Sequence, residues 1–396
     1  MIEWIGFFIS IIILLTVSRI NLGISLILGG LTLGLFTLSP ITILSTIQKT
    51  LTDPSILFLT TAVTLIPIIA GTLQISGQFD KIKENLRVGK RGFLGLSPAL
   101  LGALPIPGGA LFSAPLIEKV GVKIPGETKV GINLWFRHIL YFVYPIAPAL
   151  IISASIANIS IYSAIKYLIP FFLLSIFLGY FFFLRKIDGR IDYDKDFDLK
   201  ALLTPLSVLL AAPIIDISLK NIFKFPFENM PLLIGITVSL ILAIIFARNV
   251  KSTLIKSIKN MKPWNFTLIM IGIFIFISIF ESSGIGEMIA QISPPQIILA
   301  IGFGFGLGFI TGRINLAASI LIPIILSIFG PSSLQSFLFG VTYFSIFLGY
   351  IITPIHPCVG LSVEYFETNL TDFLKSMLPP VITGLTVTVI LFFLTV

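Results

Sequence analysis

Apolar runs of about 18 or more residues recur along most of this chain, and they constrain its fold more than any other feature. Hydrophobic residues make up 56% of the 396 positions and charged residues only 11%. A run of this length with few charges is typical of a helix that crosses the hydrocarbon core of a membrane. We therefore predict an all-α polytopic membrane protein.

The spacing of the apolar runs predicts about ten transmembrane helices and two re-entrant hairpins, which enter and leave the membrane on the same side. The predicted helices are 3–20, 22–39, 55–77, 131–157 and 160–184 in the first half, and 200–218, 231–247, 264–281, 333–362 and 376–395 in the second. The predicted hairpins are 93–118 and 296–330.

Both predicted hairpins are interrupted near their middle. In the first, Pro105, Pro107, Gly108 and Gly109 make a continuous helix unfavourable. In the second, the segment 308–319 holds glycines with a charged residue. Backbone broken at membrane depth is tolerated only where protein or a water-filled cavity satisfies its polar groups. Paired interrupted segments in corresponding halves point to the binding site of a transporter.

Three pairs of segments indicate an internal repeat. Residues 74–80 resemble 281–287, the hairpin tips follow about 206 positions apart, and Pro145 and Pro148 correspond to Pro354 and Pro357. Repeat 1 is expected over 1–187, a cytoplasmic linker over 188–199 and repeat 2 over 200–396. Five spans per repeat is an odd number, so the second copy is expected to be inverted.

The distribution of charge predicts the orientation. If the loop 78–92 is cytoplasmic, twenty of the 26 Lys and Arg residues fall on the cytoplasmic side, as the positive-inside rule requires. The protein is then expected in the cell membrane, with both termini on the side opposite the cytoplasm. The net charge of +8 does not indicate nucleic-acid binding, because it lies in short loops between apolar spans.

Arg313 is the sharpest functional signal, because a charged residue at membrane depth costs a few kcal/mol or more and is functional by default. Its guanidinium can bind a carboxylate or phosphate through two parallel hydrogen bonds, although a structural ion pair is the alternative. Other polar or flexible groups occupy matched positions of the two halves. The predicted substrate-binding residues are Arg313, Asn315, Gly108, Gly109, Ser113, Ser319 and His356.

Prolines break the helix 333–362 around His356, and freed carbonyl groups there could coordinate a cation. His356 could contact substrate, carry a coupling proton or make only a structural hydrogen bond. We predict ion-binding roles for Thr311, Thr353, Pro107 and Pro145. No cofactor is expected beyond Na⁺ or H⁺ as coupling ion. Arg137 is expected to extend its side chain to the cytoplasmic interface.

Cys358 is the only cysteine, which excludes an internal disulfide and a multi-cysteine metal site, and we predict no bound metal. An intramembrane enzyme would need a nucleophile with a base, paired acids or a metal motif. The sequence has no H-E-x-x-H motif, no G-x-S-x-G motif and no close pair of buried acids. We therefore do not expect an enzyme.

The layout of a hairpin followed by a proline-broken helix in each half resembles the ion transporter superfamily of citrate, dicarboxylate, gluconate and arsenite-type permeases. The segments 105–110 and 353–357 are similar to the prokaryotic membrane family named domain of unknown function 401, DUF401. The superfamily resemblance implies a homodimer and an elevator motion, with three scaffold helices per repeat. It also implies that each hairpin moves with two helices. The hairpin tips differ from the Ser-Asn-Thr tips of the dicarboxylate carriers, so neither substrate nor sodium stoichiometry carries over.

Together these features predict a secondary transporter of a small organic anion of the carboxylate type, coupled to Na⁺ or H⁺. An inorganic oxyanion or metalloid permease and a translocator of a lipid-phosphate carrier are the alternatives. The lipid bilayer, a small anion and a second copy of the chain are the expected partners.

Overall fold

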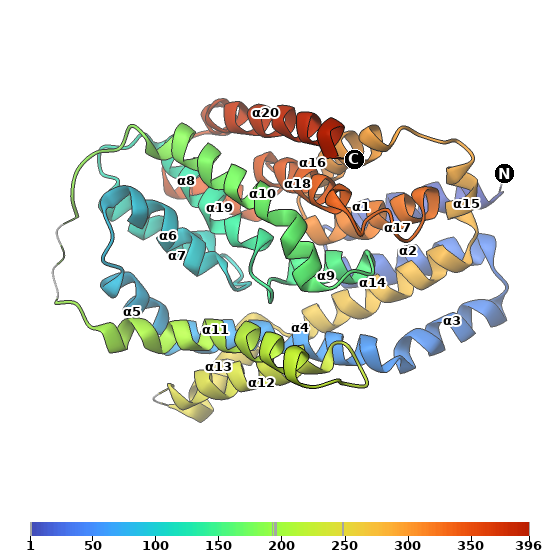
Figure 1. Ribbon diagram of the computed structural model, residues 1–396, viewed down its shortest axis with the longest axis horizontal. Coiled ribbons are helices and arrows are strands. Elements are labelled where there is room, and N and C mark those ends of the chain that lie inside the picture. The colour runs from blue at the N-terminus through green and yellow to red at the C-terminus, as the bar shows by residue number, and fades with distance from the viewer. Residues whose placement is uncertain (1, 192, 194–195, 248, 396) are drawn as a thin grey trace. The chain divides into compact units, whose positions relative to one another are not determined.

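The computed structural model describes residues 2–191, 193, 196–247 and 249–395 (Figure 1). Every regular element within these ranges is a helix, which confirms the predicted all-α class. The two terminal residues and three positions of the predicted linker, 192, 194 and 195, lie outside the described residues. So does Arg248, one of the basic residues on which the predicted orientation depends.

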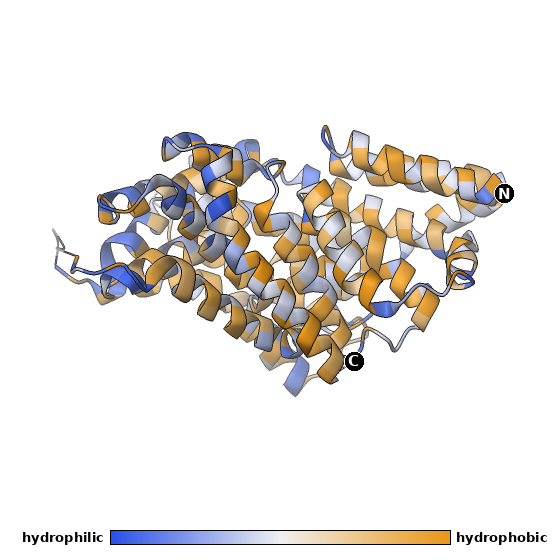
Figure 2. Ribbon diagram, turned by 90° about the horizontal axis from the view of Figure 1, so that it is seen from above, coloured by the Kyte–Doolittle hydropathy of each residue, from blue (hydrophilic) through white to orange (hydrophobic). Residues whose placement is uncertain are grey.

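Within the described ranges, six helical segments are long and apolar enough to cross a membrane. They are Pro54–Ile75, Ile161–Leu184, Leu199–Ile222, Trp264–Ser282, Phe337–Tyr365 and Leu370–Thr395. Shorter apolar helices add Ile2–Val17, Leu22–Thr37, Met230–Ile245, Ile298–Thr311 and Ile314–Phe329. Figure 2 shows hydrophobic residues along most of the helical ribbon and hydrophilic residues gathered in loops and at helix ends. The chain is therefore a multi-pass membrane protein, while the count of ten crossings and their orientation stay predictions.

The chain folds into two compact units, each assembled from stretches that are far apart in the sequence. Unit 1 comprises Met1–Ser76, Ser207–Pro294 and Ile322–Ser332. Unit 2 comprises Gly77–Leu206, Pro295–Leu321 and Ser333–Val396. Each unit thus takes residues from both halves of the chain.

Unit 1 is a bundle in which α2 packs between α1 and α14, and α4 packs against α12 and α13. Its helices are α1 (Ile2–Val17), α2 (Leu22–Thr37), α3 (Pro40–Thr52), α4 (Pro54–Ile75), most of α11 (Leu199–Ile222), α12 (Met230–Ile245), α13 (Val250–Met261), α14 (Trp264–Ser282), α15 (Ile285–Ala290) and the second part of α17 (Ile314–Phe329). Phe7, Leu33 and Phe280 belong to one buried apolar cluster that joins α1, α2 and α14.

Unit 2 holds both predicted tips and both proline-broken helices. Its elements are α5 (Gln78–Asn85), α6 (Lys90–Gly102), α7 (Ala110–Val120), α8 (Gly126–His138), a short 3-10 turn η1 (Ile139–Phe142), α9 (Pro148–Ile156), α10 (Ile161–Gly179), η2 (Tyr180–Leu184), the first part of α11, η3 (Ile298–Phe303), α16 (Gly304–Thr311), the first part of α17, α18 (Phe337–Ile352), α19 (Pro357–Tyr365) and α20 (Leu370–Thr395). The aromatic rings of Trp135, Phe142 and Phe347 pack together in its core.

The predicted interruptions are present. α6 and α7 pack against each other and are separated by the irregular residues 103–109, so the first predicted hairpin is a helix pair. The second predicted hairpin breaks at Gly312, between α16 and α17. It is not a simple copy of the first, because α17 passes from unit 2 to unit 1 after Leu321.

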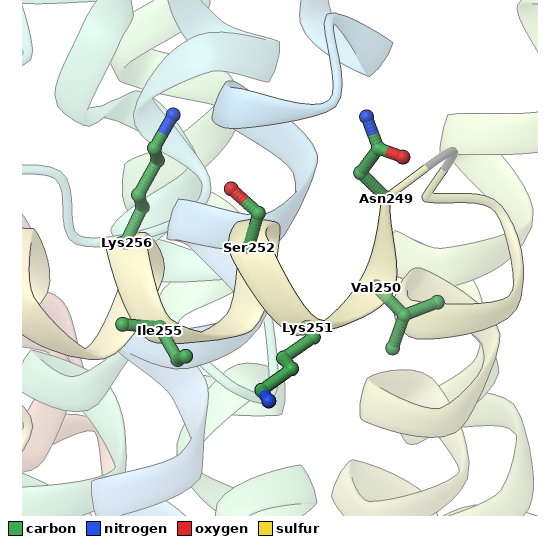
Figure 3. Close-up of a pocket in the computed structure, with 6 residues that line it drawn as sticks. All are labelled: Asn249, Val250, Lys251, Ser252, Ile255 and Lys256. Atoms are coloured by element: carbon green, nitrogen blue, oxygen red, sulfur yellow. The ribbon is translucent and has the colours of Figure 1, made fainter.

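Two helices, α3 and α13, were not predicted, because polar residues recur along them and lower their hydropathy. α13 carries Lys251, Lys256 and Lys259. Figure 3 shows a surface pocket beside its first turns, where Ser252 and Lys256 point to one side of the helix and Lys251 to the other. Another difference lies at the C-terminal end, where the helix predicted from residue 376 begins at Leu370.

Candidate functional site

The first tip is a tight backbone turn between α6 and α7. Gly108 has a φ of +65°, a conformation that glycine adopts without steric cost. The amide of Gly109 donates to the carbonyl of Ile106 at 3.0 Å. Pro107 and Gly108 are exposed at the turn, whereas Gly109 is buried. The tip therefore presents glycine backbone, with no bulky side chain, to the neighbouring helix.

Arg137 lies beneath this tip. It belongs to the last turn of α8, and a Cβ atom on Gly109 would overlap its guanidinium. The expectation that Arg137 extends to the cytoplasmic interface is wrong, because the residue is only 4% exposed. The packing of α6 and α7 on α8 covers it, and sequence position alone could not reveal this cover.

The guanidinium of Arg137 is incompletely satisfied. Its Nη1 atom is buried without a hydrogen-bond partner. No ion pair formed within the described ranges includes Arg137. A buried charge without a counter-charge is costly, so this position is suited to an anion supplied from outside the chain.

The second tip places Arg313 directly after a left-handed residue. Gly312 ends α16 with a φ of +59°, and its backbone lies against the amide nitrogen of His356. The hydroxyl of Thr311 accepts from the amide of Arg313 at 3.2 Å and so caps the turn. Arg313 itself is partly buried, and no described carboxylate forms an ion pair with it.

His356 lies beside both tips: its amide nitrogen packs against Gly312, directly before Arg313, and its ring lies 5.1 Å from that of His138, directly after Arg137. It occupies the break between α18 and α19, where its amide donates to the carbonyl of Thr353 at 3.2 Å. The amide of Ile355 donates to the hydroxyl of Thr353 at 3.3 Å. The break at His356 thus lies against the segments of both arginines, which come from opposite halves of the chain.

A second histidine joins the first. The ring centroids of His138 and His356 lie 5.1 Å apart, and the ring of Tyr350 lies 4.3 Å from that of His356. Both histidines are buried. His138 and Tyr350 were not predicted as site residues, because each lies in the part of its predicted helix that precedes the proline break.

A polar network holds the first tip to both broken helices. Asn133 on α8 donates to the carbonyl of Ala110 at 3.1 Å and to the hydroxyl of Ser362 on α19 at 3.0 Å. The hydroxyl of Ser113 donates to the side-chain oxygen of Asn133 at 2.5 Å. In Figure 1, α7, α8 and α19 lie together, as their packing contacts also require. Ser113 therefore positions the tip, whatever its role toward substrate.

The remaining predicted residues differ in whether their polar atoms have hydrogen-bond partners. Ser319 donates to the carbonyl of Asn315 at 2.7 Å, within its own helix. The side-chain oxygen of Asn315 is buried and has no partner, so it remains open to a ligand. Pro145 is half-buried at the break that precedes α9. Its role and that of Pro107 as ion ligands stay predictions.

The comparison with curated proteins found no match. A family model described as Protein of unknown function (DUF401) matches residues 4–396. Because the match covers nearly the whole chain, the predicted resemblance to this family is confirmed, and the chain belongs to the DUF401 family.

Proposed function

We propose that the protein is a secondary transporter of a small organic anion, coupled to Na⁺ or H⁺, with its binding site in unit 2. The observation that carries this proposal is the pair Arg137 and Arg313, two arginines without a described carboxylate partner whose chain neighbours His138 and Gly312 both lie against His356. Guanidinium groups recognise carboxylates through paired hydrogen bonds. An anion between them would neutralise charge that the fold leaves uncompensated.

The bounds of the helices support an internal repeat. α9 and α19 each have nine residues and begin with a proline, at Pro148 and Pro357. α2 and α12 each have 16 residues, from Leu22 and from Met230. The short helices α5 and α15 each follow a glycine with positive φ, Gly77 and Gly284. These pairs are separated by 207 to 209 positions, close to the separation that the sequence predicts.

The close approaches at the two tips support the same repeat. A Cβ atom on Gly102 would overlap the carbonyl oxygen of Arg137, and one on Gly308 would overlap that of Ile346. In each half, therefore, the helix before the tip touches the backbone of the following broken helix. Transporters with repeats of this kind bind substrate where the two copies meet.

The composition of the two units supports an elevator mechanism. Unit 1 contains the first helices of each half. These are α1 to α4 from the first half, and most of α11 with all of α12 to α15 from the second. Unit 2 contains both tips, both broken helices and the helices that follow them. This division corresponds to the scaffold and moving part that the resemblance to the ion transporter superfamily implies. We propose a homodimer on the basis of that resemblance.

We assign the binding site to the residues around the two tips. Arg313 and Arg137 would hold the anion, and the backbone of Gly108 and Gly109 would let it approach closely. The free side-chain oxygen of Asn315 would accept a hydrogen bond from a hydroxyl group or coordinate a cation. Thr353 would contribute to a cation site, because its carbonyl and hydroxyl lie where the helix is broken.

Ligand-induced stabilisation tests the binding step. The purified protein is heated in detergent with a panel of mono-, di- and tricarboxylates, each with Na⁺ or K⁺. A ligand at about 100 times its Kd stabilises the folded state by about 2.7 kcal/mol, which raises the Tm. We expect at least one carboxylate to raise the Tm of the native protein and of Arg19→Lys, an exposed control, but not of Arg313→Ala.

Inorganic oxyanions form a second arm of that panel, because two guanidinium groups also suit a divalent oxyanion. Stabilisation by sulfate, phosphate or arsenate but by no carboxylate would assign the site to the oxyanion class. Stabilisation by no anion, with all variants folded, would contradict the anion site.

A further inference from the structure

We propose that His138, His356 and Cys358 form a binding site for a divalent transition-metal ion of the zinc type. One ligand atom from each of the three side chains lies within 4.8 Å of the other two. The proposal does not depend on anion transport. It assigns a metal site where the sequence predicts none, because the fold brings two distant histidines to the only cysteine.

The three residues come from two elements of unit 2. His138 is the last residue of α8. His356 precedes α19 and Cys358 is its second residue. α8 and α19 pack against each other, and Asn133 and Ser362 form a hydrogen bond between them. The positions of the three ligands are thus fixed by contacts other than the metal.

The hydrogen bond of His138 leaves one ring nitrogen available to a metal. Its Nδ1 lies 2.7 Å from the carbonyl oxygen of Leu134. Since a carbonyl can only accept, Nδ1 carries the proton and Nε2 keeps a free lone pair. Metal-binding histidines commonly donate their other ring N–H to a backbone carbonyl in this way, which fixes both the tautomer and the ring orientation.

His356 offers a nitrogen that the protein leaves unsatisfied. The residue is 5% exposed, and its Nε2 is buried with no hydrogen-bond partner. Most buried polar side-chain atoms in proteins have a partner, so an exception calls for an explanation. A metal ion held jointly with His138 and Cys358 would satisfy this atom.

Cys358 determines the kind of metal. Two imidazoles and one thiolate suit zinc and exclude magnesium and calcium, which prefer oxygen ligands. The side chain of Arg137 lies close to the sulfur, so its positive charge would offset the negative charge of a metal-bound thiolate. Cys358 is partly exposed, which leaves a route to the site.

The spacing needs only a small adjustment. Ligand nitrogens around a tetrahedral zinc lie about 3.4 Å apart, given Zn–N bonds of about 2.0–2.1 Å. The three ligand atoms lie within 4.8 Å of one another. Shifts on the order of 1 Å would therefore bring them to the separations that a bound zinc requires. Three protein ligands leave the fourth position open to water or an anion.

Cobalt substitution tests the site, because Co²⁺ takes the place of Zn²⁺ and absorbs light. Full-length protein in detergent is stripped with a chelator and titrated with Co²⁺. We expect one Co²⁺ per chain and a thiolate-to-cobalt charge-transfer band, which Zn²⁺ abolishes by competition. Zn²⁺ should also slow modification of Cys358 by a thiol reagent, and Cys358 is the only cysteine in the chain.

Variants separate a built site from chance binding. Cys358→Ser is nearly isosteric and should abolish the charge-transfer band. His138→Ala and His356→Ala should weaken Zn²⁺ binding by at least about tenfold, because loss of supporting contacts alone costs that much. Ser345→Ala removes a hydroxyl that bonds only within α18 and should bind Zn²⁺ as the native protein does.

Absence of the band in folded native protein, or a band that persists in Cys358→Ser, would overturn the metal site. Equal Zn²⁺ affinity of folded His356→Ala and native protein would do the same. The anion panel described above contains no transition metal, so failure of the metal site and failure of the anion site give different results.

Discussion

Arg137 is a buried charge that lies beneath Gly109 at the end of α8. An arginine near the end of an apolar run has two options, to reach the interface or to be covered by neighbouring helices. The sequence favours the interface, whereas the structure buries the side chain beneath Gly109. The distinction depends on which helices pack over α8, and no pattern along α8 records that.

Replacing Arg137 by Lys tests the site at the residue scale. Lysine keeps the charge but lacks the planar pair of donors, so we expect weaker anion binding, by about tenfold or more, from loss of one charged hydrogen bond of about 1.5–3 kcal/mol. The measurement is the anion concentration that gives half-maximal Tm shift. Unchanged affinity in a folded Arg137→Lys protein would remove Arg137 from the site.

Gly308 gives a residue-scale prediction about packing. A Cβ atom there would overlap the backbone carbonyl of Ile346, which a side-chain rotation cannot relieve. Gly308→Ala should therefore destabilise the protein by about 1–3 kcal/mol. Gly306→Ala is the matched control in the same helix, since a Cβ atom at Gly306 meets nothing within 4 Å. Equal Tm values for the two variants would contradict the close approach of α16 and α18.

At the scale of elements, the sequence predicted the interrupted helices well because proline and glycine act locally. Pro148 and Pro357 begin α9 and α19, where a missing amide costs nothing. α3 and α13 were not predicted, because the many polar residues along them give a low hydropathy that is also typical of loops. The division of α17 between two units could not be predicted either, since it depends on long-range packing.

The candidate site was predicted only in part, for the same reason. Arg313, Asn315 and His356 stand out because a charged or polar residue beside a helix break is unusual at membrane depth. His138, Cys358 and Asn133 do not stand out. They join the site only through the packing of α8 against α19, which brings together residues more than 200 positions apart.

Asn133 supplies the prediction for the element scale, because its amide joins α7, α8 and α19. Asn133→Ala would leave the carbonyl of Ala110 and the hydroxyl of Ser113 without this partner. We expect a loss of about 1–3 kcal/mol in stability for the buried groups left unsatisfied. Ser345→Ala, which removes a buried hydroxyl bonded only within its own helix, should lower the Tm less. The reverse order would contradict the linking role of Asn133.

At the scale of the whole molecule, the orientation is the first matter to test. The charge distribution predicts that Arg190 faces the cytoplasm and that Ile222, at the end of α11, faces the opposite side. Single cysteines at these positions, in a Cys358→Ser background, can be labelled with a membrane-impermeant thiol reagent. We expect labelling from opposite sides in intact cells and inverted vesicles. Labelling of both from one side would show that the predicted topology is wrong.

The elevator proposal makes a second prediction at this scale. Ile355 is exposed beside the break that holds His356. If unit 2 carries the site across the membrane, a cysteine at position 355 should be accessible from each side in turn, with the balance shifted by substrate and coupling ion. Accessibility from only one side under every ionic condition would argue against alternating access at this site.

Counterflow tests the central claim, which is that unit 2 binds a small anion between two arginines and transports it across the membrane. Proteoliposomes are loaded with the unlabelled anion that best stabilises the protein and diluted into a trace of the same radiolabelled anion. We expect transient accumulation of label with native protein and Arg19→Lys, and strongly reduced accumulation with Arg137→Lys and Arg313→Lys. If native protein accumulates no stabilising anion, or both site variants transport it at the native rate, the account of this site is wrong.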